Sequence, residues 1–237
     1  MDAQRWRERA GSFGVAADVY DRSRPGYPVE AVRYVLPAVA LRVLDLGAGT
    51  GKLTGVLLDL GLDVVAVEPS APMRALLPAR AEVLEGTAES VPLPDGSIDA
   101  VLVGQAFQWF DPALALPEIA RVLRPGGTLG LLWNSRDKRV EWVREVWKRF
   151  GAEDENWGGD APFAAGSGLS EPELAMFPNN QSLDQDLLVD LVASRSMVIT
   201  LPEAERVEVL RQVRALAPQD EPFDLPYRTD AWRSVRS

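Results

Sequence analysis

The stretch Val43-Leu-Asp-Leu-Gly-Ala-Gly-Thr-Gly-Lys52 decides the fold of this chain of 237 residues. Residues typical of a strand lead into three glycines, Gly47, Gly49 and Gly51, each separated from the next by one residue. Helix-forming residues follow as far as Gly61. Because glycine has no Cβ, it permits positive φ angles and the close approach of a ligand. The pattern predicts a strand, a tight turn and a helix whose N-terminal amides point at a ligand above the turn.

The spacing of the glycines distinguishes two kinds of nucleotide-binding motif. A dinucleotide-binding fingerprint places its third glycine three residues after the second, whereas Gly51 comes one residue earlier than that after Gly49. Asp45 lies at the end of the strand, two residues before the first glycine. This arrangement resembles the first motif of class I S-adenosylmethionine-dependent methyltransferases, and the resemblance implies that Asp45 helps to hold the methionine amino group. A tight loop without a ligand is the alternative interpretation.

The composition limits the chemistry that is available. Hydrophobic residues make up 46% and charged residues 25% of the chain, which is ordinary for a globular protein, and the length suits one domain, with or without a sizeable insertion. The chain has no cysteine and no histidine. Disulfides, thiolate metal sites, histidine-ligated metals and a histidine general base are therefore excluded, and we expect no metal site.

The charge and the hydropathy pattern limit the partners. A formal net charge of −10 repels phosphate backbones, so we do not expect nucleic acid as a partner. No apolar run is long enough to span a bilayer, and residues 1–9 lack the apolar core of a signal peptide. We expect a cytoplasmic protein that acts on a small molecule away from membranes, and the sequence leaves its oligomeric state open.

Strand and helix signals alternate from residue 41 to residue 134, which is typical of a doubly wound α/β domain. Strands this apolar favour a parallel sheet that is covered on both faces. Five strands are expected, at Arg42–Leu46, Asp63–Glu68, Glu82–Glu85, Ile98–Gly104 and Thr128–Trp133. Helices are expected at Pro28–Leu36, at Lys52–Leu60, at Ser70–Leu77 with Ser70 as N-cap, and from the Asp111 cap to a stop at Arg124-Pro-Gly-Gly127.

The alternation stops after Trp133. Further helices are expected at Asp137–Phe150, Asp184–Ala193 and Pro202–Leu216, and two last strands at Ala175–Leu183 and Leu225–Val235. We interpret the chain as one Rossmann-like domain whose sheet is mostly parallel, with an antiparallel strand near the C-terminus. Its expected segments are a cap at 1–40, a cofactor-binding core at 41–134, a substrate-side elaboration at 135–225 and a last strand at 226–237.

An acid also ends the second expected strand. Glu68 follows Gly47 at about the distance of the acid that binds a ribose in nucleotide-binding folds. A carboxylate at this position accepts hydrogen bonds from both ribose hydroxyls. The alternatives are a solvated acid, or a negative charge that favours the start of the next helix.

The resemblance to the methyltransferases extends over about residues 10 to 135. It implies that Gly86-Thr-Ala-Glu-Ser-Val-Pro-Leu-Pro-Asp95 borders the adenine, with Ala88 and Glu89 near the ring. Gln105-Ala-Phe-Gln-Trp-Phe110 resembles the Gln-Ala-Phe-His-Trp-Phe signature of a subgroup that includes trans-aconitate methyltransferases, with Gln108 in place of the histidine. Aromatic faces attract a sulfonium cation, although Phe107 and Phe110 could equally belong to the core.

The segment before the first strand carries a similar resemblance. Tyr20, Arg24 and Tyr27 match a Tyr, Arg-Pro, Tyr-Pro pattern that closes over the cofactor in such relatives. The resemblance implies that Arg24 pairs with the methionine carboxylate. A surface arginine in a proline-stiffened loop is the alternative.

Together these inferences predict one cofactor site and one reaction. The residues expected to bind S-adenosyl-L-methionine are Tyr20, Arg24, Asp45, Gly47, Ala48, Gly49, Thr50, Gly51, Glu68, Pro69, Met73, Thr87, Ala88, Glu89, Gln105, Ala106 and Trp109. The expected reaction is methyl transfer to a small molecule, with O- or carboxyl-methylation favoured because a carboxylate needs no base. No catalytic residue is assigned. A non-catalytic S-adenosylmethionine-binding module and a nicotinamide-dependent oxidoreductase remain as alternatives.

Overall fold

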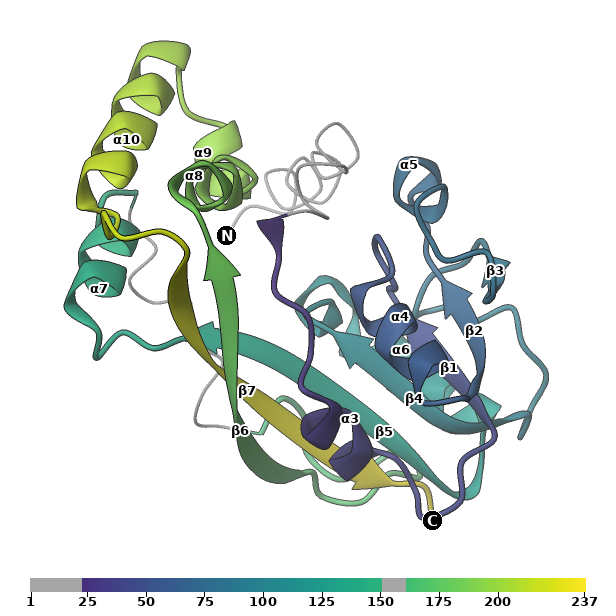
Figure 1. Cartoon of the computed structure of the whole chain (residues 1–237). Helices are drawn as coiled ribbons and strands as arrows, with labels where there is room; N and C mark the ends of the chain where they lie inside the picture. Colours follow the sequence, from purple (N-terminus) through teal and green to yellow (C-terminus); the bar gives the residue numbers. More distant parts are fainter. Residues whose placement is uncertain (1–22, 151–160) are drawn as a thin grey trace. The chain divides into compact units, whose positions relative to one another are not determined.

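The computed structural model describes residues 23–150 and 161–237 (Figure 1). Its described strands form one sheet in the order β3-β2-β1-β4-β5-β7-β6. The strands are β1 Arg42–Leu46, β2 Asp63–Val67, β3 Glu82–Leu84, β4 Ile98–Gly104, β5 Leu123–Arg136, β6 Glu173–Leu183 and β7 Phe223–Val235. All seven predicted strands are present, and most of their predicted ends are within two residues of those in the structure.

The order of the strands creates a switch point between β1 and β4. β1 pairs in parallel with β2 on one side and with β4 on the other, and the parallel ladder continues to β3 and to β5. β7 is antiparallel to β5, since Gly126 N–H donates to Arg236 O and Asp137 N–H donates to Pro226 O. The predicted Rossmann-like α/β fold, with a mostly parallel sheet and antiparallel pairing near the C-terminus, is confirmed.

The described residues belong to two compact units. The larger unit contains residues 26–134, 161–179 and 229–237, and the smaller unit contains residues 23–25, 135–150 and 180–228. The helices of the larger unit are α3 Val29–Val35, α4 Lys52–Asp59, α5 Ala71–Arg74, the 3₁₀ turn η2 Phe107–Trp109 and α6 Pro112–Val122. Those of the smaller unit are α7 Glu141–Lys148, α8 Gln185–Ala193, α9 Ser196–Ile199 and α10 Glu203–Leu216.

The core of the larger unit covers both faces of the sheet. Successive strand residues point to opposite faces, so Val43 belongs to a cluster with Leu57 of α4, whereas Leu44 belongs to a cluster with Ile119 of α6. All four side chains are fully buried. This burial on both faces explains why the parallel strands are almost continuously apolar.

Side-chain caps start two of the helices, and the sequence predicts the first of them, at Asp111. The Asp111 carboxylate accepts a hydrogen bond from Ala113 N–H at 3.0 Å at the start of α6. The Asp184 carboxylate accepts one from Leu187 N–H at 2.7 Å at the start of α8. Each cap satisfies an amide that has no partner within its own helix.

Several predicted boundaries are wrong, and α7, for example, begins at Glu141 instead of Asp137. Ser70 is the N-cap residue of α5 as predicted, although its side chain makes no cap hydrogen bond. The helix ends at Arg74 instead of Leu77, because the chain then tightens into turns that bond Leu76 N–H to Met73 O and Leu77 N–H to Arg74 O. β5 begins at Leu123 instead of Thr128, because the backbone from 126 to 127 pairs with Arg236.

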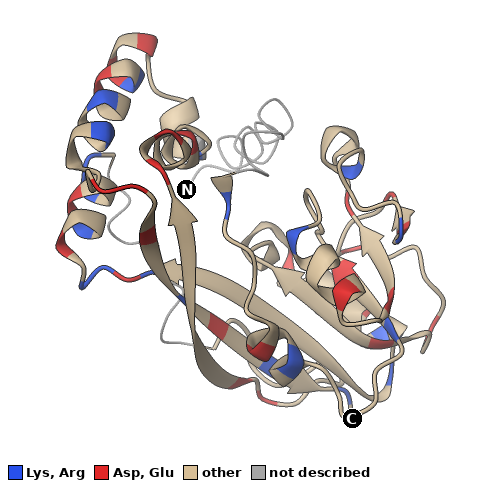
Figure 2. Ribbon diagram, viewed as in Figure 1, with Lys and Arg blue, Asp and Glu red and all other residues tan. Residues whose placement is uncertain are grey.

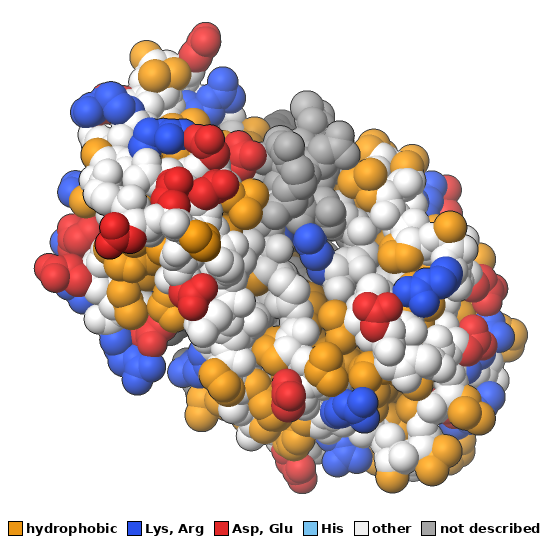
Figure 3. All heavy atoms as spheres, in the orientation of Figure 1, with side chains coloured by type: hydrophobic (Ala, Val, Ile, Leu, Met, Phe, Trp, Pro, Cys, Tyr) orange, Lys and Arg blue, Asp and Glu red, His pale blue; other side chains and the backbone are white. Residues whose placement is uncertain are grey.

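The surface carries charges of both signs. Figure 2 shows Arg interspersed with Glu along α10, and acidic and basic side chains are mixed over the face seen in Figure 3. Along the described ranges, no helix has the length and apolar character needed to cross a bilayer.

Candidate cofactor site

The glycine turn between β1 and α4 requires glycine for two separate reasons. Gly47, Gly49 and Gly51 have φ angles of 72°, 57° and 93°, a region in which side chains with a Cβ are strained. A Cβ on Gly47 would lie 2.8 Å from Ala106 Cβ, and one on Gly51 would lie 2.6 Å from Pro78 Cδ. The predicted tight turn is confirmed, and it is packed closely against the chain that follows β4.

Four amides of this turn donate within the protein. Gly47 and Ala48 N–H both donate to Val67 O, and Gly51 N–H donates to Ala48 O. Gly49 N–H donates to Glu68 Oε2 at 2.9 Å. These four bonds fasten the turn to itself and to the end of β2. The predicted ligand contacts concern the N-terminal amides of α4, which begins at Lys52, and they stay a prediction.

Asp45 is a buried carboxylate next to the turn. It is 1% exposed, and its Oδ2 accepts a hydrogen bond from Thr54 Oγ1 at 2.6 Å. Burial raises the pKa of Asp45 to about 7; the bonds from Thr54 oppose the rise and the charge of Glu68 adds to it. Asp45 Oδ1 and Thr50 Oγ1 are both buried and have no hydrogen-bond partner among the described residues. Two buried polar atoms are thus left to meet a ligand.

Glu68 holds the other side of the turn. It is 7% exposed, so the alternative of a solvated acid is excluded. Its Oε2 bonds to Gly49 and its Oε1 accepts from Ser70 N–H at 2.9 Å. Each carboxylate oxygen retains a second lone pair that can accept a hydroxyl. Met73 is buried beneath the turn, with its Sδ 3.9 Å from where a Cβ on Gly49 would lie.

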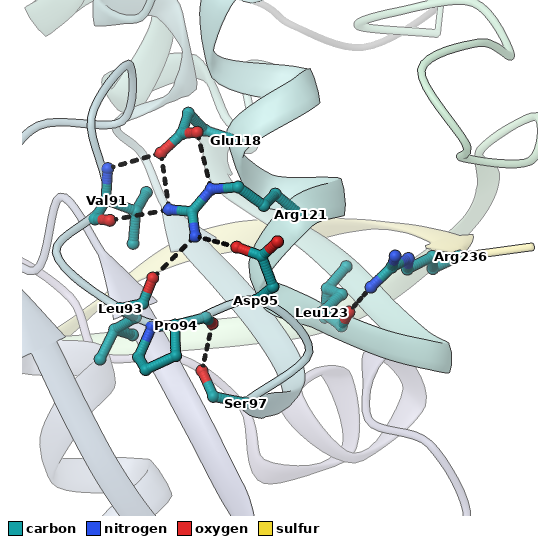
Figure 4. A network of polar contacts seen from close by, with 9 residues as sticks. All are labelled: Val91, Leu93, Pro94, Asp95, Ser97, Glu118, Arg121, Leu123 and Arg236. Atoms are coloured by element: carbon teal, nitrogen blue, oxygen red, sulfur yellow. Dashed lines mark hydrogen bonds and ion pairs between the residues drawn. The ribbon is translucent and has the colours of Figure 1, made fainter.

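The loop after β3 is held in place by Arg121 of α6, which the sequence analysis missed (Figure 4). Arg121 donates to Val91 O at 3.0 Å and to Leu93 O at 2.8 Å. It also binds Glu118 and Asp95, and its hydrogen bond is the main reason why the pKa of Glu118 is lowered. The spacing of Glu118 and Arg121, three residues apart on one helix, is the signal that could have indicated this network.

This fixed loop carries the residues predicted near the adenine. Ser90 N–H donates to Thr87 O, Ala88 is 3% exposed, and Glu89 Oε1 accepts a hydrogen bond from Asp111 N–H at 2.9 Å. The loop is thereby attached to the first turn of α6. Figure 4 also shows Arg236, whose guanidinium donates to Leu123 O at the far end of the same helix.

Gln105, directly after β4, has an unusual backbone. Its φ of 54° places a residue with a side chain in the left-handed region, at a cost of about 1–3 kcal/mol. Its N–H donates to Leu132 O, its carbonyl accepts from Gln108 Nε2 at 2.7 Å, and its Oε1 accepts from Asn134 N–H at 2.9 Å. These three hydrogen bonds maintain the strained conformation.

Of the residues that follow Gln105, some are buried in the core and others are half-buried. Phe107 is 2% exposed and makes edge-to-face contacts with Phe110 and Trp133, so it belongs to the core. Gln108 uses both ends of its amide, donating to Gln105 O and accepting from Trp133 Nε1 at 3.3 Å. Ala106 and Trp109 are half-buried. Gln108 therefore joins this turn to β5.

A second group of residues missed from the sequence is centred on Asn134 of β5. Asn134 Nδ2 donates to Gly26 O at 3.0 Å, and its Oδ1 accepts from Asn179 Nδ2 at 3.0 Å and from Thr229 Oγ1 at 2.6 Å. Gly26 is followed by Tyr27, whose Oη lies 2.6 Å from where a Cβ on Gly104 would be. Asn134 therefore fixes the chain that carries Tyr27 to the carboxyl end of β4.

The structure brings most of the predicted residues to the carboxyl ends of β1, β2 and β4. Asp45, the glycine turn, Glu68 and Ala106 lie together there, Pro69 follows shortly after β2, and Met73 lies in α5. Arg24 belongs to the smaller unit, and Tyr20 lies outside the described residues. Among the residues that the structure describes, no group of three or more acids could hold a metal ion.

Known proteins resemble this chain over most of its length. The methyltransferase domain family matches residues 44–131. An uncharacterized methyltransferase of Mycobacterium tuberculosis is 51% identical over 218 residues, which are 89% of this chain and 87% of the relative.

Solved structures share the fold. A protein of Anaeromyxobacter dehalogenans, solved as a candidate type II methyltransferase, superposes with a TM-score of 0.67 at 22% identity, covering 90% of this chain and 97% of the other. A phospholethanolamine N-methyltransferase of Haemonchus contortus, solved with S-adenosylhomocysteine, has a TM-score of 0.54 at 15% identity and covers 98% and 59%.

Proposed function

Because this chain belongs to the S-adenosylmethionine-dependent methyltransferases, we propose that it methylates a small molecule on oxygen, with a carboxylate as the favoured acceptor. The observation that carries this choice is the shortage of bases. The chain has no histidine and no cysteine, and at the position of the subgroup's histidine it has Gln108, whose amide is bonded at both ends. A carboxylate is already a nucleophile at neutral pH, so its methylation requires no proton acceptor.

The residues present fit the cofactor. Asp45 Oδ1, buried without a described partner, would accept a hydrogen bond from the ammonium group, and the remaining lone pairs of Glu68 would accept the ribose hydroxyls. Ala88 and Glu89 would border the adenine. The other residues of the proposed site are Tyr20, Arg24, Gly47, Ala48, Gly49, Thr50, Gly51, Pro69, Met73, Thr87, Gln105, Ala106 and Trp109.

When bound, the cofactor supplies a methyl group that the positive sulfur has already activated. The protein then has to hold the acceptor oxygen in line with that methyl group and to exclude water. Fixed groups suit this task. The strained turn at Gln105 is held by three hydrogen bonds, and the loop from 88 to 95 is held by Arg121.

The likeness of Gln105–Phe110 to trans-aconitate methyltransferases supports the same choice of acceptor, and membership of that subgroup is part of this proposal. So is a cytoplasmic location with a small molecule as partner. The net charge of −10 disfavours nucleic acid as the acceptor.

Methyl transfer can be measured with a radiolabelled cofactor and three matched sets of small acceptors, namely carboxylic acids, phenols and amines. We expect calorimetric binding of S-adenosylhomocysteine, and label transfer to acids that is released as methanol by mild alkali, as methyl esters require. Transfer to alkali-stable products would contradict carboxyl-methylation. Binding without transfer to any set in a metabolite extract would favour the non-catalytic module.

A further inference from the structure

Gln105 combines backbone strain with an unused donor. Its left-handed conformation is maintained by bonds to Leu132, Gln108 and Asn134. In the described part of the chain, no group accepts a hydrogen bond from its Nε2. Strain of this kind persists where the surrounding structure enforces it, and it is concentrated at sites of function.

The orientation of the Gln105 amide is set by chemistry. The Asn134 backbone N–H, 2.9 Å from Oε1, is a donor, and only the oxygen of an amide can accept from it. The NH₂ group of Gln105 is therefore the part left over for a ligand. A group that can only donate recognises oxygen, most strongly a carboxylate, and gives no hydrogen bond to an ammonium group.

The position of Gln105 determines which part of the cofactor it would meet. β4 pairs with β1, and Ala106 reaches the glycine turn at Gly47, so Gln105 lies at the switch point of the sheet. A nucleoside held by Glu68 after β2 and by Ala88 after β3 leaves its amino-acid part over β1, toward β4. Asp45, at the end of β1, suits the ammonium of that part and leaves its carboxylate for donors, of which the resemblance implies Arg24 as one.

We propose that Gln105 Nε2 donates a hydrogen bond to the carboxylate of the cofactor's amino-acid part, and that Asn134 N–H is the positioning group that orients the amide. The inference rests on the proposed placement of the nucleoside. In this arrangement different residues bind the two charged groups of the amino acid. Asp45 binds the ammonium, and Gln105 donates one of the hydrogen bonds to the carboxylate.

Two ligands that differ only in the amino-acid part test this contact. S-adenosylhomocysteine has it, whereas 5′-methylthioadenosine has the same nucleoside and a thioether without it. For Gln105→Glu, which keeps an oxygen for Asn134 N–H but replaces the donor with a negative charge, we expect the Kd of S-adenosylhomocysteine to rise about tenfold or more. The Kd of methylthioadenosine stays as in the wild type.

Three further variants complete the test. Gln105→Gly suits the positive φ, so it should fold, and we expect it to show the same selective loss. Glu68→Gln should weaken both ligands equally because it acts on the nucleoside. Thr128→Val, at a buried hydroxyl that bonds to Val35 O, should change neither affinity.

The outcomes are distinct. If both Gln105 variants weaken the two ligands by the same factor, or weaken neither, Gln105 does not contact the amino-acid part and the proposal is overturned. If the wild type itself binds neither ligand, the proposed cofactor site fails instead. Melting temperatures measured alongside show that each variant is folded when its Kd is determined.

Discussion

At the scale of single residues, Asp45 has the most perturbed environment at the site. A carboxyl group ionises less readily when it is removed from water, and the near-complete burial of Asp45 raises its pKa to about 7 from 3.8. The group therefore holds its proton to a much higher pH than an exposed aspartate does. Because only the ionised form can pair with an ammonium, the affinity for the cofactor should depend on the charge of this one side chain.

The first prediction concerns Asp45→Asn. The folded state holds the Asp45 proton more tightly than the unfolded chain between pH 3.8 and about 7, so wild-type stability should decrease as the pH rises through that window. The limiting slope is about 1.4 kcal/mol per pH unit. Asp45→Asn, which can still accept the bond from Thr54, should lose this component of the slope. Urea unfolding at several pH values measures it.

Measuring cofactor affinity provides a second test with the same variant. The affinity of the wild type for S-adenosylhomocysteine should fall below pH 7, whereas Asp45→Asn should bind weakly at all pH values. Asp59→Asn, an exposed acid paired with Arg80, serves as the control and should behave as the wild type does. A pH profile of binding that is identical in the wild type and in Asp45→Asn would refute the role of Asp45.

At the scale of elements, the site depends on loops that are attached to helices and strands by a few polar side chains. Arg121 fastens the loop after β3 to α6 by binding two of its carbonyl groups. Asn134 fastens the segment before α3 to β5. Loops are otherwise the least constrained parts of a fold, so these ties determine how well the site is prearranged.

Arg121→Met should release the loop from 88 to 95. Hydrogen bonds to charged groups contribute about 1.5–3 kcal/mol each, so we expect a loss of at least about 1.5 kcal/mol in urea unfolding and faster amide hydrogen exchange over residues 88–95. Arg80→Met removes only the exposed pair with Asp59 and should change stability by less than about 1 kcal/mol. Unchanged exchange over residues 88–95 in Arg121→Met would contradict the proposed tie.

Asn134→Ala and Thr128→Val form a matched pair on β5. Each removes a buried side chain that donates to a backbone carbonyl near α3, Gly26 O in one case and Val35 O in the other. Both should lose about 1–3 kcal/mol of stability. Only Asn134→Ala should also weaken S-adenosylhomocysteine, because it releases Tyr27 from the carboxyl end of β4. Equal affinities for the two variants would show that Asn134 is purely structural.

At the scale of the whole molecule, the predicted cofactor residues that the structure describes belong to the larger unit, with Arg24 as the exception. The smaller unit has its own apolar core, in which Val146, Leu191 and Val213 are fully buried. Each unit therefore has an apolar core of its own. Because most of the predicted cofactor residues belong to the larger unit, we expect ligand binding to slow amide hydrogen exchange there.

Saturation with S-adenosylhomocysteine tests whether the cofactor site lies in the larger unit. A ligand at a hundred times its Kd adds about 2.7 kcal/mol to the stability of the state that binds it. We expect slower amide hydrogen exchange at 47–51 and 87–89, compared with exchange in the ligand-free protein. Protection confined to residues 141–148 and 185–216 would contradict the proposed site.

The sequence alone determined the features that depend on neighbours along the chain. Apolar runs and breakers predicted the strands within a few residues, and the glycines from 47 to 51 predicted the turn, because a positive φ is a local requirement. Asp45 and Glu68 were identified from their distance to that turn. Each of these features depends on residues that are close together along the chain, so the sequence pattern alone indicates it.

The tertiary structure decided which groups face one another. Asn134 is 29 residues from Gln105 and 108 residues from Gly26, and no short-range pattern predicts that they meet. The direction of the turn amides and the burial of Asp45 also depend on β2 and α4 packing against β1. The orientation of each donor, and hence what it can bind, follows from contacts between segments that only folding brings together.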